Sequence, residues 1–258
     1  MSSILFQIEN GIATLTLNRP DKLNSFNREM ALLMQNRLDE CSSLHEVRCV
    51  FITGAGKGFS AGQDLAEISG NGAPSMNQIL SEHYNPIVSR IRNLPKPVVA
   101  AVNGVAAGAG ANIALCCDVV IASESASFIQ AFSKIGLIPD SGGTYFLPRL
   151  VGWQKASALA MLGEKISAGE AERMGMIYKA FSNELFPGES KKIAQTLAKM
   201  PTKGLALTKH ALNYSFSNSL EEQLITEDEL QQKAANTEDY REGVNAFLNK
   251  REPKFKGV

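Results

Sequence analysis

The sequence is poor in the residues that most often carry metal-assisted or nucleophilic chemistry. It holds three histidines and four cysteines in 258 residues, without a C-x-x-C pair or a metal-ligand spacing. Cys116 and Cys117 are adjacent, which makes a poor metal clamp. No Ser/His/Asp or Cys/His arrangement is legible. We therefore expect no metal site, no catalytic triad and free thiols buried in a reducing compartment.

A surplus of charge is also missing. Twenty-six basic side chains balance twenty-six acidic ones, so the formal net charge is zero. This argues against a protein that binds nucleic acid through bulk charge, and it fits a chain that hides surface in an oligomer. The first residues, MSSILFQIEN, lack the basic and then apolar stretches of a secretory signal, so we expect a cytoplasmic protein.

One uncharged run is long enough to cross a bilayer, the 20 residues of 98–117. Asn103 and Asn112 interrupt it, and alanine and glycine dominate it. VVAAV after Pro97 predicts a buried strand, and NGVAAGAG predicts a tight turn that leads into a short helix. We therefore expect no membrane span and no membrane partner.

Hydrophobic periodicity predicts an α/β core followed by a helical region. Alternation over residues 4–17 around Asn10-Gly11 predicts a hairpin, and Asn27 is placed to cap the next helix. Further strands are expected at 47–53, 98–102, 119–122, 127–130 and 176–181, a loop at 69–75, and helices at 76–94, from 142 with breaks at Gly152 and Gly163, and from 187 onward with a break at Pro201. We place the core at 1–200 and the helical region at 201–258.

Three segments rich in small residues could hold a ligand: FSAGQD (59–64), NGVAAGAGA (103–111) and GLIPDSGGT (136–144). Free amides at a helix N-terminus can hold a negative oxygen. Plainer interpretations are a helix cap for Asp64, close packing for the second segment and a helix cap for Asp140. For Asp140 the alternative to a helix cap is a buried carboxylate that transfers a proton. The two interpretations predict opposite pKa shifts, because burial raises a carboxyl pKa and a helix N-terminus lowers it.

Taken together, the motifs resemble the enoyl-CoA hydratase/isomerase (crotonase) family over essentially the whole chain. They are LTLNRP (15–20), ITGAGKGFSAGQDL (52–65), KPVVAAVNGVAAGAG (96–110), CCDVVIAS (116–123) and YREGVNAF (240–247). The resemblance implies a crotonase-like α/β spiral of β-β-α units, with 201–258 as a helical trimerisation region of a homotrimer or hexamer. It also implies an acyl-CoA substrate, with coenzyme A part of that substrate rather than a cofactor.

The family holds a thioester enolate with two backbone amides, which match those of Gln63 and Ala109. Asp140 matches the single carboxylate of the isomerases and would shuttle the proton. The positions that match coenzyme A contacts are Lys22, Leu23, Ala61, Asp64 and Leu65, with Lys254 or Lys256 reaching phosphates, on this or a neighbouring subunit.

The hydratases of the family carry glutamates at the positions that match Asn112 and Phe132. Neither an amide nor an aromatic ring can carry a proton in that role, so water addition is disfavoured. We expect both residues in the substrate pocket, Phe132 as an apolar wall and Asn112 orienting substrate or water.

AFSKIGLIPDSGGTYFLPRLVG (131–152) resembles the branch that converts ring-1,2-epoxyphenylacetyl-CoA to oxepin-CoA in phenylacetate breakdown. The alternative is an isomerase of aliphatic 3-enoyl-CoA. A dehalogenase branch also has an aspartate at the site of Asp140, but its histidine matches Asn85, two residues from His83. A non-catalytic member that binds RNA is the remaining alternative, against which the absence of a basic stripe argues.

Overall fold

The computed structural model describes residues 2–69 and 72–258, so part of the predicted loop at 69–75 lies outside the described residues. The elements in chain order are β1 (Ile4–Glu9), β2 (Ile12–Leu17), η1 (Pro20–Lys22), α1 (Arg28–Ser43), β3 (Cys49–Gly54), β4 (Gly58–Ser60), α2 (Met76–Gln78), the π-helical turn η2 (Ile79–Tyr84), α3 (Asn85–Asn93), β5 (Val98–Val102), β6 (Val105–Ala107), α4 (Ala109–Leu115), β7 (Val119–Ser123), β8 (Ser127–Ile129), η3 (Ala131–Ile135), α5 (Gly143–Leu162), β9 (Lys165–Ser167), α6 (Ala168–Arg173), β10 (Lys179–Phe181), α7 (Phe186–Lys199), α8 (Thr202–Tyr214), α9 (Leu220–Ala235) and α10 (Glu238–Leu248).

The strands form two sheets that the chain visits alternately. The larger has the order β1-β2-β3-β5-β7-β10, and the smaller has the order β4-β6-β8-β9. Each pair β3–β4, β5–β6 and β7–β8 places one strand in each sheet, and the corresponding strands of successive pairs are parallel. This repeated step produces the predicted spiral of β-β-α units and aligns the carboxyl ends of β4, β6 and β8.

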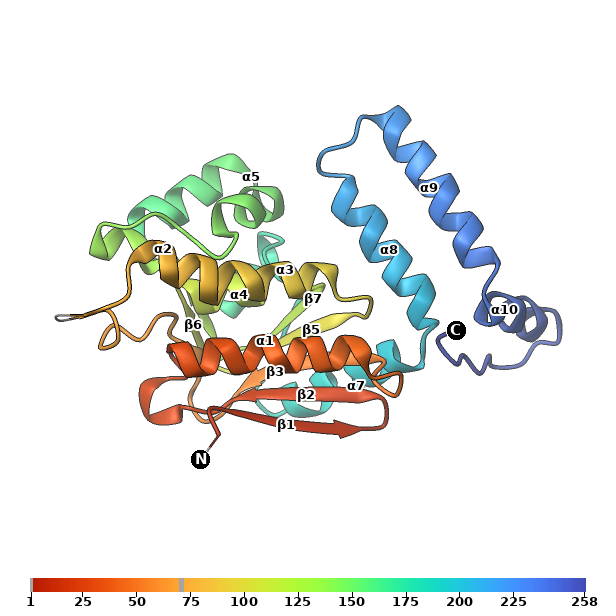
Figure 1. The fold of residues 1–258 in the computed structure, drawn as a ribbon, viewed down its shortest axis with the longest axis horizontal. Helices are drawn as coiled ribbons and strands as arrows, with labels where there is room; N and C mark the ends of the chain where they lie inside the picture. The colour runs from red at the N-terminus through yellow and green to blue at the C-terminus, as the bar shows by residue number, and fades with distance from the viewer. Residues whose placement is uncertain (1, 70–71) are drawn as a thin grey trace.

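Both faces of the large sheet are buried, as the continuous apolar run of β5 predicts. Val50, Ile52 and Ala100 belong to the main core, which includes apolar side chains of α1 and α3. Phe51 and Val99 face the other way, into a smaller core that includes α7. Figure 1 shows α1 and the α2–α3 segment together on one side of the strands.

The last three helices stand apart from the sheets (Figure 1). Helix α8 begins immediately after Pro201, the predicted break, and its Lys209 is anchored in the core by a 2.8 Å ion pair with Asp118. Beyond that anchor, many large apolar side chains of this region are exposed, among them Leu212, Leu220, Leu224, Ile225, Phe247 and Leu248.

The uncharged run 98–117 folds as β5, β6 and α4, not as one continuous helix. No helix within residues 2–69 and 72–258 is long and apolar enough to cross a membrane. All four cysteines are free and buried, as predicted. Desolvation by burial raises the pKa of the Cys41 thiol to about 12, which makes it a poor nucleophile.

Several element predictions need correction. The sequence analysis predicted one regular helix over 76–94, but its middle is the π-helical turn η2. The strand expected over 176–181 is confined to Lys179–Phe181, and the short strands β4, β6 and β9 were missed. Three-residue strands are too short to show a periodic pattern, and two of them lie in glycine-rich segments that predict turns.

Candidate active site

Three loops meet where β4, β6 and β8 end, and together they form the floor of a pocket. Ser60 pairs with Ala106 across β4 and β6, and Ala107 pairs with Ile129 across β6 and β8. Because neighbouring parallel strands end at the same edge, the residues that follow them lie side by side. This arrangement brings Gln63, Ala109 and Phe132 together from distant parts of the sequence.

The main-chain N–H groups of Gln63 and Ala109 are left without acceptors among the described residues. The carbonyl of Gly62 accepts the Phe26 amide at 2.6 Å, and the carbonyl of Gly108 accepts the Asn112 amide at 3.1 Å. In a trans peptide the N–H points opposite to the C=O. Both N–H groups therefore point away from their own elements, and both residues line the same cavity.

Glycine allows the close approach of the two loops. A methyl group added at Gly62 would lie 2.8 Å from the Ala107 carbonyl oxygen and 3.2 Å from the Ala109 nitrogen. Gly62 also has a φ of +85°, in the region that disfavours other residues. We call the Gln63 and Ala109 amides the amide cradle; the geometry suits an oxygen that gains negative charge.

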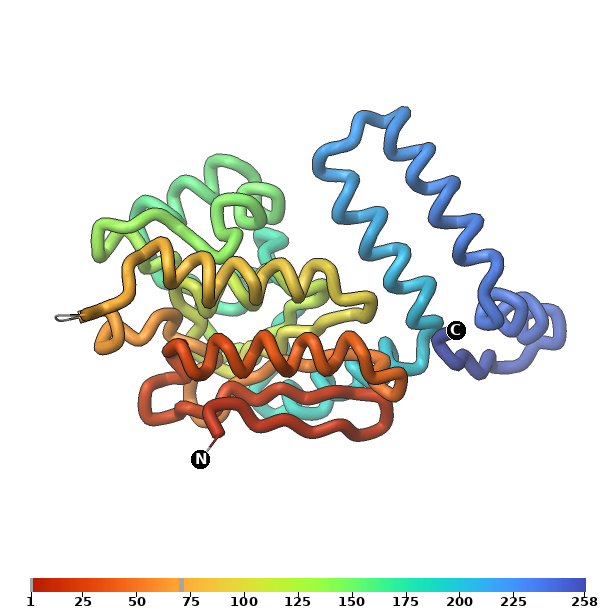
Figure 2. The backbone as a smooth tube through the Cα atoms, viewed as in Figure 1, coloured from red at the N-terminus to blue at the C-terminus, as the bar shows by residue number. Residues whose placement is uncertain are grey.

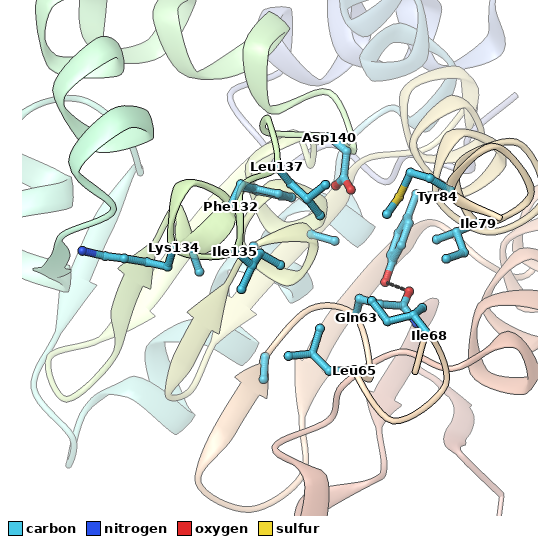
Figure 3. Close-up of a pocket in the computed structure, with 15 residues that line it drawn as sticks. Gln63, Leu65, Ile68, Ile79, Tyr84, Phe132, Lys134, Ile135, Leu137 and Asp140 are labelled. Atoms are coloured by element: carbon cyan, nitrogen blue, oxygen red, sulfur yellow. Dashed lines mark hydrogen bonds between the residues drawn. The ribbon is translucent and has the colours of Figure 1, made fainter. Parts of the chain in front are cut away.

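The cavity beside the amide cradle has a volume of about 350 Å³ and is largely apolar. It is lined by Ala61, Gln63, Leu65, Ile68, Met76, Ile79, Tyr84, Gly108, Ala109, Ala131, Phe132, Lys134, Ile135, Leu137 and Asp140. The Phe132 ring contacts this floor, since a methyl at Gly108 would lie 3.8 Å from it. Figure 3 shows Gln63 on one side of the cavity and Asp140 on the other.

Asp140 supplies the one carboxylate among the described residues that line the cavity. Its side chain accepts a hydrogen bond from the Ser141 hydroxyl at 2.8 Å and forms no ion pair within the described part of the chain. Desolvation by burial raises the Asp140 pKa and outweighs the opposing effect of Ser141. Gly142, not Asp140, caps α5, so the helix-cap interpretation of Asp140 is wrong.

Asn112 does not line the cavity, contrary to the expectation that it orients substrate or water. It is 1% exposed, and its amide donates to the main-chain oxygen of Asp140 at 2.8 Å. Gln130 in turn donates to the Asn112 oxygen at 2.7 Å. Asn112 therefore fixes the backbone that carries Asp140, a role that needs a donor and that a carboxylate could not fill.

Replacing Asn112 with aspartate should therefore damage both stability and turnover. A carboxylate oxygen would face the Asp140 carbonyl oxygen in place of an N–H, at an expected cost of about 1–3 kcal/mol. Denaturant unfolding and steady-state kinetics measure the two effects. Asn93→Asp, on the exposed side of α3, is the matched control; equal stability of both variants would contradict this role for Asn112.

Of the five positions expected to contact coenzyme A, two line the cavity and three do not. Ala61 and Leu65 line the cavity, and the Ala61 amide donates to the Leu23 carbonyl at 2.9 Å, which places Leu23 beside Ala61. Asp64 is no helix cap; it pairs with Arg19 at 2.8 Å, and this interaction lowers its pKa. Lys22 is exposed on the short helix η1.

The tail lysines, Lys254 and Lys256, do not line the cavity of their own chain. Both residues follow α10, and Figure 1 shows the C-terminus on the same side of the molecule as α8 and α10, away from α2 and α5. Main-chain amides of both residues are bound by acidic side chains of α10, Glu242 and Asp239. Contact between these lysines and a substrate, in this chain or in a neighbouring subunit, stays a prediction.

His83 is 2% exposed but does not line the cavity, and its ring faces Arg28. Sequence reasoning missed Tyr84, the next residue, which is 1% exposed and has its hydroxyl at the cavity. A regular helix over 76–94 gives no reason to single out Tyr84. The π-helical turn lies just before Pro86, whose missing N–H marks an interruption of the helix in the sequence but does not give the direction of Tyr84.

Comparison with known proteins shows the family to which the chain belongs. The family model described as enoyl-CoA hydratase/isomerase matches residues 7–258. The chain belongs to the enoyl-CoA hydratase/isomerase family. The chain is 48% identical to the 1,2-epoxyphenylacetyl-CoA isomerase of Escherichia coli, covering 100% of this chain and 99% of that protein. It is 44% identical to a protein of Rhodobacter capsulatus named probable enoyl-CoA hydratase, covering 99% and 98%.

The fold is that of solved family members. The enoyl-CoA hydratase of Bacillus anthracis superposes with a TM-score of 0.95 at 32% identity, over 99% of this chain and 100% of that one. This confirms the predicted family and fold class. The family includes both hydratases and isomerases, so family membership makes the chain an enzyme of CoA thioesters without separating the two reactions.

Proposed function

We propose that this enzyme is an isomerase of CoA thioesters that converts ring-1,2-epoxyphenylacetyl-CoA to oxepin-CoA. The observation that carries the proposal is the single carboxylate, Asp140, in an apolar cavity opposite the amide cradle. A burial-raised pKa brings a carboxylate closer to the pKa of a useful general base. The 48% identity to an enzyme named for this reaction supports the aromatic epoxide as substrate.

In the proposed reaction, Asp140 removes a proton from the carbon next to the thioester carbonyl. The electron pair moves onto the thioester oxygen, which the amide cradle stabilises as an enolate. The carbon–carbon bond shared by the epoxide and the six-membered ring then opens to give the seven-membered ring. The proton returns from Asp140 to a ring carbon, so that no atom is gained or lost.

Hydration is a weaker candidate for this cavity. It needs one group to activate water and another to deliver a proton, a task suited to two carboxylates. Among the described lining residues Asp140 provides one, Phe132 is a ring, and Asn112 is committed to the Asp140 backbone. Isomerisation moves one proton between two nearby carbons, which one carboxylate can do.

Isomerisation of an aliphatic 3-enoyl-CoA is the second candidate. Leu65, Ile68, Ile79, Ile135 and Leu137 give the cavity an aliphatic wall that fits a hydrocarbon chain. The proton transfer by Asp140 and the enolate in the amide cradle would be the same.

The exposed apolar side chains of α8, α9 and α10 support assembly into a trimer or hexamer. In this proposal coenzyme A is held near Lys22, Leu23, Ala61, Asp64 and Leu65.

Steady-state rates on three substrates test the proposal. We expect the highest kcat/KM on the phenylacetyl-CoA epoxide, a lower value on a 3-enoyl-CoA and little water addition to a 2-enoyl-CoA. Rapid hydration of the 2-enoyl-CoA with no isomerisation of the other two would contradict it. A higher kcat/KM on the 3-enoyl-CoA would select the second candidate.

A further inference from the structure

The side chain of Gln63 is held at both ends, although family chemistry uses only its main-chain N–H. The Tyr84 hydroxyl donates to the Gln63 side-chain oxygen at 2.8 Å. The Gln63 side-chain nitrogen donates to Glu67 at 2.9 Å. Figure 3 shows the Tyr84 ring reaching from the Asp140 side of the cavity to this oxygen.

The π-helical turn η2 places Tyr84 there. The Asn85 amide donates to the carbonyl of Leu80, five residues earlier, rather than four as in an α-helix. Five-residue spacing directs Ile79 and Tyr84 to different faces of an α-helix, yet both line the cavity here. Figure 2 shows the segment continuing as one coil through α2, η2 and α3. Such single π-helical turns occur frequently at functional sites.

Tyr84 contacts both residues that orient the Gly62–Gln63 peptide. Its ring packs edge-on against Phe26, with 6.1 Å between ring centroids, and the Phe26 amide binds the Gly62 carbonyl. Its hydroxyl holds the Gln63 side chain on the other side of the same peptide. The main chain on either side of this peptide pairs with Phe26, since the Asp64 amide also donates to the Phe26 carbonyl at 2.8 Å. Tyr84 therefore supports the peptide both through Phe26 and through the Gln63 side chain.

Burial keeps the hydroxyl available as a donor. Desolvation, together with the nearby carboxylates of Asp140, Glu67 and Asp64, raises the Tyr84 pKa well above its ordinary value. The phenol therefore stays protonated at neutral pH.

We propose that Tyr84 is a positioning residue of the amide cradle: its bond to the Gln63 side chain keeps the Gln63 N–H aimed at the thioester oxygen. This inference rests on the proposed use of the cradle for a thioester. Asp140 and the Ala109 amide remain in place without the Tyr84 hydroxyl. Loss of the hydroxyl therefore weakens stabilisation of the enolate and leaves substrate binding intact.

The test is Tyr84→Phe, read by infrared difference spectroscopy of bound phenylacetyl-CoA carrying ¹³C at the thioester carbonyl. This ester lacks the epoxide and cannot isomerise. We expect the bound carbonyl band of the unaltered enzyme to shift to lower frequency, and a smaller shift in the variant. On the reactive substrate, kcat should fall at least ~10-fold while KM changes less than ~3-fold, because the lost contact strengthens only in the transition state.

Two further variants make the result specific. Gln63→Met keeps the main-chain N–H but removes the side-chain acceptor, so it should lower kcat as Tyr84→Phe does. The double variant should then lose no more than either single one. Tyr178→Phe, at an exposed tyrosine outside the cavity, controls for loss of a phenol and should leave kcat and the carbonyl shift unchanged.

The outcomes separate the inference from the function on which it rests. A carbonyl shift in the unaltered enzyme that is equally large in Tyr84→Phe would overturn the positioning role alone. Additive losses in the double variant would also overturn it, because the hydroxyl would then act without Gln63. Absence of any shift in the unaltered enzyme would contradict the proposed function itself.

Discussion

Replacing Asp140 with asparagine is expected to lower kcat at least ~100-fold while binding of CoA thioesters survives. Asparagine has the same shape and can still accept the Ser141 hydrogen bond, but it cannot take up a proton. Turnover assays and calorimetric titration with phenylacetyl-CoA measure the two quantities. Asp228→Asn, on the exposed surface of α9, is the matched control, and near-normal turnover by Asp140→Asn would remove the proton shuttle.

The same variant should be at least as stable as the original protein at neutral pH. Burial raises the Asp140 pKa above its ordinary 3.8, so the folded protein binds this proton more tightly than the unfolded chain does. The free energy that this group contributes to folding is therefore lost as pH rises through the raised pKa. Above that pKa the ionised carboxylate destabilises the folded protein. Asparagine has no ionised form, so it removes this destabilisation. The difference in Tm between Asp140→Asn and the original protein should vanish below about pH 3.8.

The pH dependence of catalysis has the same origin. The base form of Asp140 is required, so kcat/KM should fall as pH drops through its pKa. The acid limb of the profile should lie above pH 3.8, in the direction that burial dictates. The limb should be absent from the residual activity of Asp140→Asn.

Replacing Ala109 with proline should have an effect of similar size for a different reason. Ala109 is the first residue of α4, a position at which proline is readily accommodated because its N–H has no helical partner. The substitution deletes one donor of the amide cradle, and the new ring carbons point into the cavity. Loss of one such donor is expected to lower kcat about 10²–10³-fold.

Two controls separate the loss of the Ala109 N–H donor from the backbone restriction that proline introduces. Ala109→Gly keeps the N–H and should retain most activity. Glu238→Pro places proline at the first residue of the exposed helix α10, where the preceding residue is already extended, and should leave kcat unchanged. If Ala109→Pro is folded by circular dichroism and turns over at more than about a tenth of the original rate, the Ala109 amide has no large role.

Much of the architecture could be predicted because burial and strand period leave clear marks in the sequence. The alternation around Asn10-Gly11 predicted the hairpin that β1 and β2 form. Asn27 caps α1 through the Met30 amide, as predicted, and Gly152 and Gly163 interrupt and end α5. Each of these signals is local, since neighbouring residues fix the backbone.

The parts that could not be predicted depend on contacts between distant segments. The resemblance matched Gln63 and Ala109, but only the parallel pairing of β4 and β6 explains why both residues line one cavity. The position of Asn112 implied a pocket residue, whereas its environment is set by Gln130 and the Asp140 backbone, 18 and 28 residues away. Tyr84 was missed because one extra residue in a helical turn changes its direction without changing the hydrophobic pattern.

The central claim is that Asp140 moves a proton next to a thioester whose oxygen the amide cradle holds. Exchange of the α-hydrogens of phenylacetyl-CoA in deuterium oxide, followed by proton NMR, tests it without the epoxide chemistry. The account predicts rapid exchange with the unaltered enzyme and loss of exchange in both Asp140→Asn and Ala109→Pro. Exchange at an undiminished rate in Asp140→Asn would contradict it.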